Sequence, residues 1–157
     1  MRIIVRAVGK LPEAWQREAC ASYAERLGAI FPLQIQECPE GHGGSAKPDT
    51  ERVKAAETEA LLRGLPPDAV LIALDERGKS VSSEAFAQAM DEWSEHGQRP
   101  LAFCIGGSWG LDANLRTKAR ATVAFGPMTL PHGLARVVLL EQLYRAAMIR
   151  TGRAYHK

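Results

Sequence analysis

The chain has 157 residues, of which 46% are hydrophobic and 24% are charged, and its formal net charge is +2 at pH 7. This composition is ordinary for one globular domain over residues 1–157, and it excludes collagen-like, low-complexity and strongly acidic chains. No apolar run reaches the roughly 18 residues that a membrane-spanning helix requires, and the N-terminal apolar run is broken by Arg6. The three cysteines show no metal-ligand spacing, which favours reduced thiols in a cytoplasmic protein without a metal.

Predicted strands and helices alternate along the chain. In order, we expect a strand over 3–8, a helix over 12–27, a strand over 33–38, a helix over 50–63 and a strand over 70–74. A helix over 82–96, a strand over 101–105, a helix over 111–119, a strand over 121–125 and a helix over 133–151 follow. The third strand should end before a polar turn at Asp75, and residues 39–48 should form a loop. This alternation predicts an α/β fold with an open, mainly parallel sheet that helices cover on both faces.

The helix predicted over 133–151 is apolar nearly all round rather than along one stripe. Its apolar residues include Leu134, Val137, Val138, Leu140 and Leu143. A helix with this pattern is buried on two sides. In so small a domain we expect one side to pack on the sheet and the other to meet a second copy of the chain, which predicts a homodimer.

Two predicted strands end in loops rich in glycine and proline. The strand over 101–105 runs into Gly106-Gly107-Ser108-Trp109-Gly110, and the strand over 121–125 runs into residues 126–133. Parallel strands bring their carboxyl ends to one edge of a sheet, where ligands bind, and glycine lets a ligand approach the backbone closely. We therefore expect the two loops to line one binding crevice.

The loop at 106–110 leaves more than one interpretation open. It lacks the complete dinucleotide-binding spacing and the Lys-Ser/Thr ending of a phosphate-binding loop. It matches the Gly-x-Ser-x-Gly turn of serine hydrolases, with Ser108, Glu141 and His156 in the chain order of that fold. The chain is short for that fold, however, and Glu141 falls on a predicted helix. A tight turn that only needs the conformational freedom of glycine is the third interpretation.

Positive charge gathers in the last part of the chain. From Arg136 onward five cations and one anion give a net charge of +4, so the preceding residues sum to −2. Such a segment can contact RNA phosphates, or its cations can simply complement the dipole of the last helix. The candidate phosphate contacts are Arg136, Arg145, Arg153 and Lys157.

Several of these motifs, taken together and in this order, resemble one known family. They are Ala7-Val8-Gly9-Lys10, Leu74 with its acidic follower, Ile105-Gly106-Gly107-Ser108-x-Gly110-Leu111, Leu130-Pro131-His132 with Arg136-Val137-Val138, Glu141-Gln142-x-Tyr144-Arg145-Ala146 and the terminal Tyr155-His156-Lys157. Over essentially its whole length the chain resembles the RlmH family, the large-subunit ribosomal RNA pseudouridine N3-methyltransferases of the SPOUT class. Trp109 departs from the family pattern, at a position that varies.

The resemblance implies a homodimeric SPOUT methyltransferase that transfers a methyl group from S-adenosylmethionine to N3 of a pseudouridine in 23S rRNA within the ribosome. It also implies a deep C-terminal trefoil knot, which contradicts the default that chains do not thread loops. The cofactor site of the family would carry over to Leu74, Gly106, Phe125, Gly126, Pro127, Met128, Thr129 and Leu130.

The implied reaction needs little chemistry from the protein. The acceptor nitrogen must lose its proton, so a base or a cation is required beside it. The candidates are His156, Arg136 and Tyr155, and His156 is favoured for handling the proton. A serine hydrolase that uses Ser108 and a non-catalytic RNA-binding module on the same fold remain as alternatives.

Overall fold

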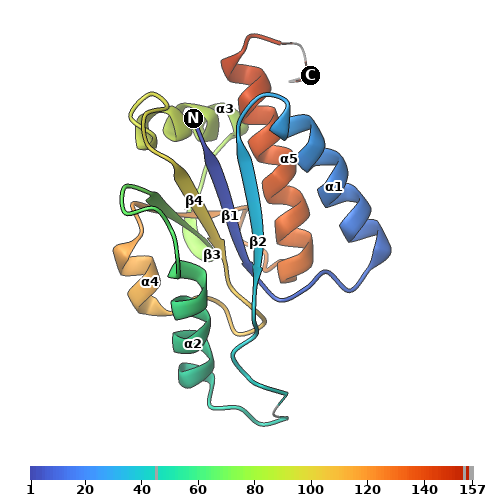
Figure 1. The fold of residues 1–157 in the computed structure, drawn as a ribbon, viewed down its shortest axis with the longest axis vertical. Coiled ribbons are helices and arrows are strands. Elements are labelled where there is room, and N and C mark those ends of the chain that lie inside the picture. Colours follow the sequence, from blue (N-terminus) through green and yellow to red (C-terminus); the bar gives the residue numbers. More distant parts are fainter. Residues whose placement is uncertain (45, 154, 156–157) are drawn as a thin grey trace.

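The computed structural model describes residues 1–44, 46–153 and 155. Its strands form a five-stranded sheet in the order β2-β1-β4-β3-β5 (Figure 1). They are β1 (Ile3–Val8), β2 (Leu33–Cys38), β3 (Val70–Ser80), β4 (Leu101–Ile105) and β5 (Ala121–Ala124). Every neighbouring pair of these strands runs parallel, so that Phe103 of β4 lies between Val5 of β1 and Ile72 of β3. The predicted α/β fold with its parallel sheet is confirmed.

Helices cover both faces of this sheet, as Figure 1 shows. They are α1 (Ala14–Gly28), α2 (Thr50–Leu62), α3 (Ser83–Trp93), α4 (Ala113–Lys118) and α5 (His132–Arg150). α1, α3 and α5 share one apolar core with the sheet, whereas α2 and α4 pack over a smaller core on the opposite face. Side-chain caps begin three of the helices: Ser82 accepts the N–H of Ala85 at α3, Asp49 accepts the N–H of Glu51 at α2, and Asp112 accepts the N–H of Asn114 at α4.

Alternate side chains of the central strands enter the two cores, which is why these strands are apolar almost throughout. Ile3 of β1 and Phe103 of β4 enter the core shared with α1, α3 and α5. Val8 and Cys104 point to the other face. Burial raises the pKa of the Cys104 thiol to about 12, and all three cysteines are free and buried. The three thiols therefore belong to the core.

β3 is longer than the sequence predicts, and the end expected at Leu74 is wrong. Leu74 pairs with Val123 of β5, and Lys79 returns to the same Val123, so residues 75–78 bulge out of the ladder between them. These polar residues have the composition of a turn, and pattern alone therefore stops the strand there. A side chain at Gly78 would come within 2.7 Å of the backbone of Thr122, so only glycine lets the strand close on β5 again.

α5 lies between α1 and α3 on the sheet (Figure 1). It buries Leu139, Leu140 and Leu143 within its own chain, so this chain covers much of the apolar surface of the helix. Leu134 and Val138, one helical turn apart, stay half-buried. The homodimer requires a second chain, and both the homodimer and the trefoil knot stay predictions. No described helix, α5 included, is long and apolar enough to cross a membrane.

Candidate active site

A cavity of about 680 Å³ opens where β4 and β5 end and β3 bulges, at the carboxyl edge of the sheet. This volume is typical of sites for small ligands. The two glycine-containing loops line it together, as predicted, and the bulge of β3 and the first turn of α5 complete its wall. The lining residues are Leu74, Asp75, Glu76, Arg77, Ile105, Gly106, Gly107, Ser108, Trp109, Gly110, Val123, Ala124, Phe125, Gly126, Met128, Thr129, Leu130, Pro131, His132 and Ala135. Within the described ranges no group of three or more His, Cys, Asp or Glu residues could hold a metal ion.

The loop after β4 is a tight turn that places bare backbone on the cavity wall. The N–H of Gly110 donates to the carbonyl of Gly107 at 3.0 Å, and Gly110 has a φ of +77°, a conformation that favours glycine. A side chain at Gly106 would lie 2.8 Å from the carbonyl carbon of Gly110. The turn therefore closes only because these positions lack a Cβ, and its backbone stays accessible to a ligand.

A buried carboxylate supports this turn from the α2 side. Glu57 is 3% exposed, and its carboxylate accepts the N–H of Gly107 at 3.4 Å and the N–H of Gly41 at 3.1 Å. A side chain at Gly107 would come 2.9 Å from Glu57 Oε1, so the carboxylate and the glycine require each other. Burying a carboxylate is unfavourable unless hydrogen bonds replace its hydration. The two backbone donors supply this replacement, and the same bonds fix both loops.

Sequence reasoning missed Glu57, although a signal for it exists. Val53, Glu57 and Leu61 recur at four-residue spacing and all three are buried, so the acid lies on the apolar face of α2. Glutamate is rarely buried unless it has partners. The position of Glu57 on the apolar face of α2 could have identified it as a buried, partnered acid, whereas composition alone indicated only a charged helix.

The loop after β5 forms another wall of the cavity. Gly126 has a φ of +116°, and Thr129 Oγ1 donates a hydrogen bond to Glu76 in the bulge of β3. The structure gathers most of the residues predicted to bind the cofactor, and those that line the cavity are Leu74, Gly106, Phe125, Gly126, Met128, Thr129 and Leu130. Pro127 is exposed and is not among the lining residues.

Asp75 fixes the bulge of β3 through two arginines. Its side chain is 3% exposed and pairs with Arg77 Nε at 2.9 Å and with Arg116 Nη1 at 3.3 Å. Burial raises the pKa of Asp75, but hydrogen bonds from Arg77 and the charges of both arginines outweigh burial and hold the pKa below its usual value. Asp75 is therefore ionised at neutral pH, and it holds Arg77 on the cavity wall.

Arg136 lies behind the cavity rather than on its wall. Its side chain is 2% exposed, Nη1 pairs with Glu37 of β2 at 2.6 Å, and Nη2 donates to the carbonyl of Gly9 at 2.8 Å. These contacts join α5 to β2 and to the loop after β1, one helical turn beyond His132, which does line the cavity. The sequence predicts Arg136 as a catalytic and phosphate-contacting residue, but from this position it would have to leave both partners to reach a substrate.

The other C-terminal candidates gather around the second half of α5. Tyr155 Oη donates to Glu141 Oε1 at 3.4 Å, and the guanidinium carbon of Arg145 lies 4.9 Å from the centroid of the Tyr155 ring. A hydrogen bond with Tyr23 and burial raise the pKa of Tyr155 to about 12. Arg145 also pairs with Glu141 at 2.6 Å, so the charge of this arginine is largely satisfied within its own helix.

These residues and the cavity lie at opposite ends of α5. At a rise of about 1.5 Å per residue, Arg145 is about 15 Å along the helix from Ala135, which lines the cavity. Arg150, nearer still to the end of the helix, contacts Met1 beside the amino end of β1. The exposed Arg153 follows α5, and His156 and Lys157 lie outside the described residues. One chain therefore does not bring its own Arg145 and Tyr155 to its cavity.

The geometry does not favour the Gly-x-Ser-x-Gly interpretation. Ser108 sits inside the 107–110 turn and α4 begins only at Ala113, whereas a nucleophile elbow leads directly from strand to helix. Glu141 pairs with Arg145 on α5 and is not among the residues that line the cavity with Ser108. The tight-turn interpretation describes this loop better.

Replacing Asp75 with asparagine tests the anchoring of the bulge. We expect Asp75→Asn to lower the free energy of unfolding by about 1–3 kcal/mol at neutral pH, because charged hydrogen bonds to two arginines are lost. The pKa of Asp75 is lower in the folded than in the unfolded protein, so its contribution is present above about pH 4 and is lost as the pH falls through the folded-state value. Urea unfolding of both proteins between about pH 7 and pH 2 should show the difference shrinking.

Asp68→Asn is the matched control for this experiment. Asp68 is exposed, and its carboxylate makes no ion pair with the described part of the chain. We expect this variant to unfold like the wild type at each pH. A loss of stability in Asp75→Asn that stayed constant down to low pH would contradict the assignment, since a protonated Asp75 resembles an asparagine.

Comparison with known proteins places this geometry in a family. A family model described as "Predicted SPOUT methyltransferase" matches residues 1–156. The chain is 40% identical over 163 residues to a protein named "Ribosomal RNA large subunit methyltransferase H" from Nitrobacter hamburgensis, covering 100% of this chain and 99% of the relative. It is equally 40% identical, with the same coverage, to the protein of that name from Dinoroseobacter shibae.

Two solved structures share the fold at low sequence identity. A probable methyltransferase from Bordetella pertussis matches with a TM-score of 0.56 at 16% identity, over 93% of this chain and 94% of the other. A probable methylase family protein from Haemophilus influenzae matches with a TM-score of 0.53 at 13% identity, over 99% of this chain and 70% of the other. The sheet, the cavity at its carboxyl edge and the full-length sequence matches agree, and the chain belongs to the SPOUT methyltransferase family, within the group named ribosomal RNA large subunit methyltransferase H.

Proposed function

We propose that this protein transfers a methyl group from S-adenosylmethionine to N3 of a pseudouridine in 23S rRNA of the ribosome, in the cytoplasm and as a homodimer of single-domain protomers. The observation that carries the proposal is the cavity at the ends of β4 and β5 and the bulge of β3, walled by the two glycine-containing loops. The printed name of the relatives that are 40% identical over the whole chain supports ribosomal RNA as the substrate.

The residues of the cavity fit S-adenosylmethionine. Leu74, Ile105 and Leu130 offer apolar walls for an adenine ring, and the backbone of both loops offers donors and acceptors for its edge. Gly106 places no side chain between the ligand and the backbone. Glu76, also on the wall, contributes negative charge that complements a cationic sulfonium. When bound there, the cofactor supplies an electrophilic methyl group.

In this reaction the protein itself orients the acceptor and handles one proton. Methyl transfer is an in-line displacement, so correct positioning contributes much of the acceleration. Loss of the imide proton is assisted by a base or a cation beside the nitrogen. We assign the proton to His156, with Arg136 and Tyr155 as further candidates. Because the pKa of Tyr155 is about 12, its phenol is protonated at neutral pH and acts as a hydrogen-bond donor.

The position of the tail favours action between two protomers. Arg145 and Tyr155 lie at the end of α5 remote from their own cavity, so in the arrangement that we propose the tail of one protomer serves the cavity of the other. The half-buried Leu134 and Val138 on α5 offer apolar surface for contact between the protomers.

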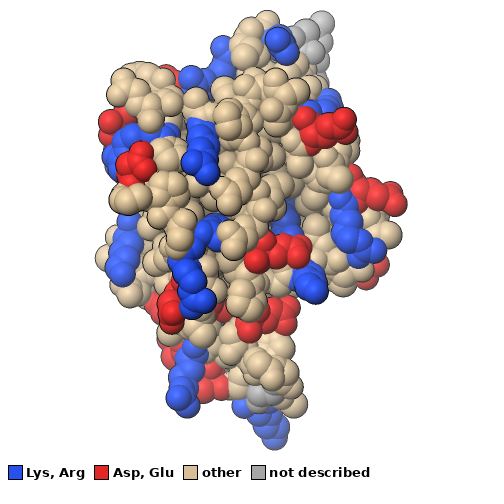
Figure 2. Space-filling view, viewed as in Figure 1, with Lys and Arg blue, Asp and Glu red and all other residues tan. Residues whose placement is uncertain are grey.

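On the face drawn in Figure 2, Lys and Arg alternate with Asp and Glu rather than forming a continuous basic surface. We assign RNA phosphates to the individual cations Arg145, Arg153 and Lys157, whereas the buried Arg136 would first have to leave Glu37 and Gly9 to contact one.

Transfer of tritium from S-adenosylmethionine to ribosomes that lack the modification tests the proposed function. We expect label in 23S rRNA, and nucleoside mapping should place it on N3 of a pseudouridine. Label in another nucleoside, or none with fully folded protein, would contradict the substrate. Calorimetric titration with S-adenosylmethionine distinguishes the methyltransferase from a non-catalytic RNA-binding module, which need not bind this cofactor. Fluorophosphonate labelling of Ser108 would identify a serine hydrolase.

Replacing Glu57 tests how far the turn after β4 depends on the buried carboxylate. Glu57→Gln keeps the size of the side chain but brings an N–H₂ donor toward one of the two backbone N–H groups. We expect the dissociation constant of S-adenosylmethionine to rise about tenfold, because one charged hydrogen bond to the loop is lost. Calorimetry measures this constant, and far-ultraviolet circular dichroism checks the fold.

Glu59→Gln on the same helix is the matched control. Glu59 is exposed, and among the described residues its side chain pairs only with Arg63, one helical turn away, so its replacement should leave the dissociation constant unchanged. Equal affinities of Glu57→Gln and the wild type for S-adenosylmethionine would show that the turn after β4 does not depend on the carboxylate.

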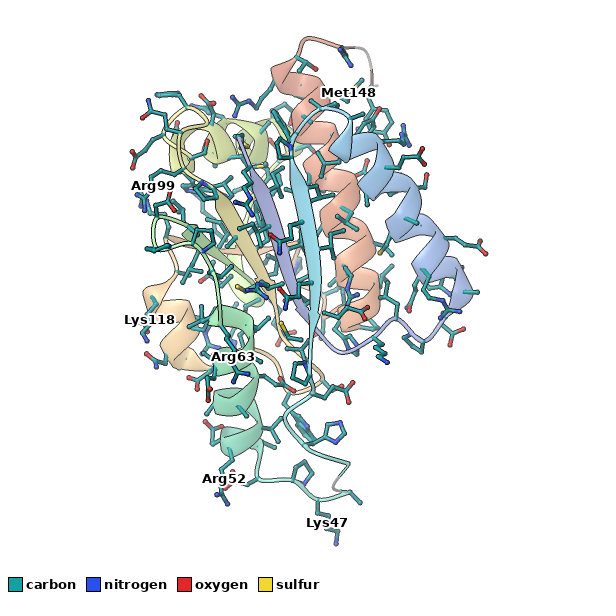
Figure 3. All side chains as sticks on the ribbon, in the orientation of Figure 1. Lys47, Arg52, Arg63, Arg99, Lys118 and Met148 are labelled. Carbon is teal, nitrogen blue, oxygen red and sulfur yellow. The ribbon has the colours of Figure 1, made fainter. Side chains whose placement is uncertain are left out.

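Neutralising Arg153 tests the assignment of RNA phosphates. If Arg153 contacts one phosphate, Arg153→Gln should weaken binding to ribosomes and reduce the slope of log affinity against log salt by about 0.7–0.9. Filter binding over a range of salt concentrations measures the slope. Arg63→Gln is the control, because Arg63 directly follows α2 and lies well away from Met148 near the C-terminal end of α5 (Figure 3). A slope that Arg153→Gln leaves unchanged would refute the contact.

A further inference from the structure

Trp109 stands at the mouth of the cavity with its indole largely uncovered. It is 48% exposed although it lines the cavity, and it occupies the tip of the 107–110 turn. Within the described part of the chain the indole makes no ring contact and no cation–π contact. Met128, on the loop after β5, is 79% exposed and lines the same cavity. Two large, exposed apolar side chains therefore line this cavity.

We propose that Trp109 is a stacking platform for an unpaired nucleobase of the RNA substrate at the entrance to the cofactor cavity. This proposal rests on the proposed function and extends it, since it names the group that the cavity entrance holds. Met128 supplies a second, flexible apolar contact, and Arg77 supplies positive charge for the phosphate of the same nucleotide.

The chemistry of the acceptor requires such a platform. N3 of a pseudouridine lies on its pairing edge, so the base must be unpaired, and turned out of its helix, before a methyl group can reach it. An unpaired base loses its stacking neighbours, and an aromatic side chain replaces them whatever the base, because every base has a π-face. Leucine, methionine or valine would offer contact area but no such face.

The surroundings of Trp109 hold it in place for this task. The hydrogen bond between Gly107 and Gly110 closes the turn, and Glu57 anchors Gly107 from below. The indole is thus presented by a constrained backbone, which reduces the entropy lost when RNA binds.

Positive charge lies beside the same turn. Arg77 Nη2 is 3.9 Å from the position that a Cβ would take on Gly110, the neighbour of Trp109. Arg77 is held by Asp75 through two hydrogen bonds, and yet its side chain is 61% exposed. A guanidinium fixed in this way beside an indole can meet the phosphate of a base that stacks on the ring.

Three variants test the proposal by steady-state methyl transfer to ribosomes that lack the modification. Trp109→Leu removes the aromatic face and is expected to raise the KM for ribosomes about tenfold or more. Trp109→Phe retains a stacking ring and is expected to restore the KM to within about threefold of the wild type. Trp15→Leu is the matched control, because Trp15 is also exposed but lies on α1 and does not line the cavity. Its KM should equal that of the wild type.

Two further measurements distinguish a loss of base stacking in Trp109→Leu from a loss of cofactor binding or a change of oligomeric state. The calorimetric affinity for S-adenosylmethionine should change by less than about threefold in Trp109→Leu, far less than the KM for ribosomes, because about half of the indole is exposed to solvent rather than enclosed by the cavity. Sedimentation should show the same oligomeric state in both. If the wild type itself transfers no methyl group, the proposed function fails, and that result is visible before any variant is compared.

Four results would overturn the stacking platform. They are an unchanged KM in Trp109→Leu, a Trp109→Phe variant as weak as Trp109→Leu, an equal loss in Trp15→Leu, and a shift of Trp109→Leu toward monomers. The last result would assign the exposed indole to the contact between protomers instead of to RNA.

Discussion

The cavity depends on the hydrogen bonds that the buried carboxylate of Glu57 accepts from the backbone of Gly107 and Gly41. Three of the five residues in the turn after β4 are glycines, so a ligand can approach the backbone there, but a segment so rich in glycine has few side-chain contacts of its own to keep it in place. A carboxylate beneath it supplies directional contacts without adding a side chain to the cavity wall. Glycine at 107 is the only residue that leaves room for this arrangement. The shape of the site thus follows from a charge that never contacts the ligand.

Other charges buried around the cavity act in the same way. Asp75 holds Arg77 and Arg116 and so fixes the bulge of β3, while Arg136 ties the first turns of α5 to Gly9 and Glu37. Arginine and aspartate near a predicted site suggest direct chemistry when only their type is known. Their burial and their partners give them a positioning role here, because an ion pair closed off from water holds its geometry more firmly than an exposed one.

The length of α5 separates two groups of residues that the sequence analysis assigns to one site. Pro131 and His132 begin the helix at the cavity, and Arg145 and Tyr155 lie near its other end. A helix is stiff, so this spacing cannot be closed by bending within one chain. A second protomer is the simplest way for the tail to take part in the reaction, and the half-buried side of α5 is where we expect the two chains to meet.

The sequence by itself determined the parallel α/β sheet and the two loops that follow β4 and β5, because periodicity and turn composition are local properties. Its ordered motifs also carried the resemblance to the family. Only the tertiary structure decided that β3 continues to Ser80, that Glu57 supports Gly107, and that Arg136 is enclosed. Each of these depends on residues far apart in the chain: 50 positions separate Glu57 from Gly107, and 127 separate Arg136 from Gly9. No spacing within one helix or strand encodes such a meeting, since the packing of helices on the sheet decides which side chains come into contact.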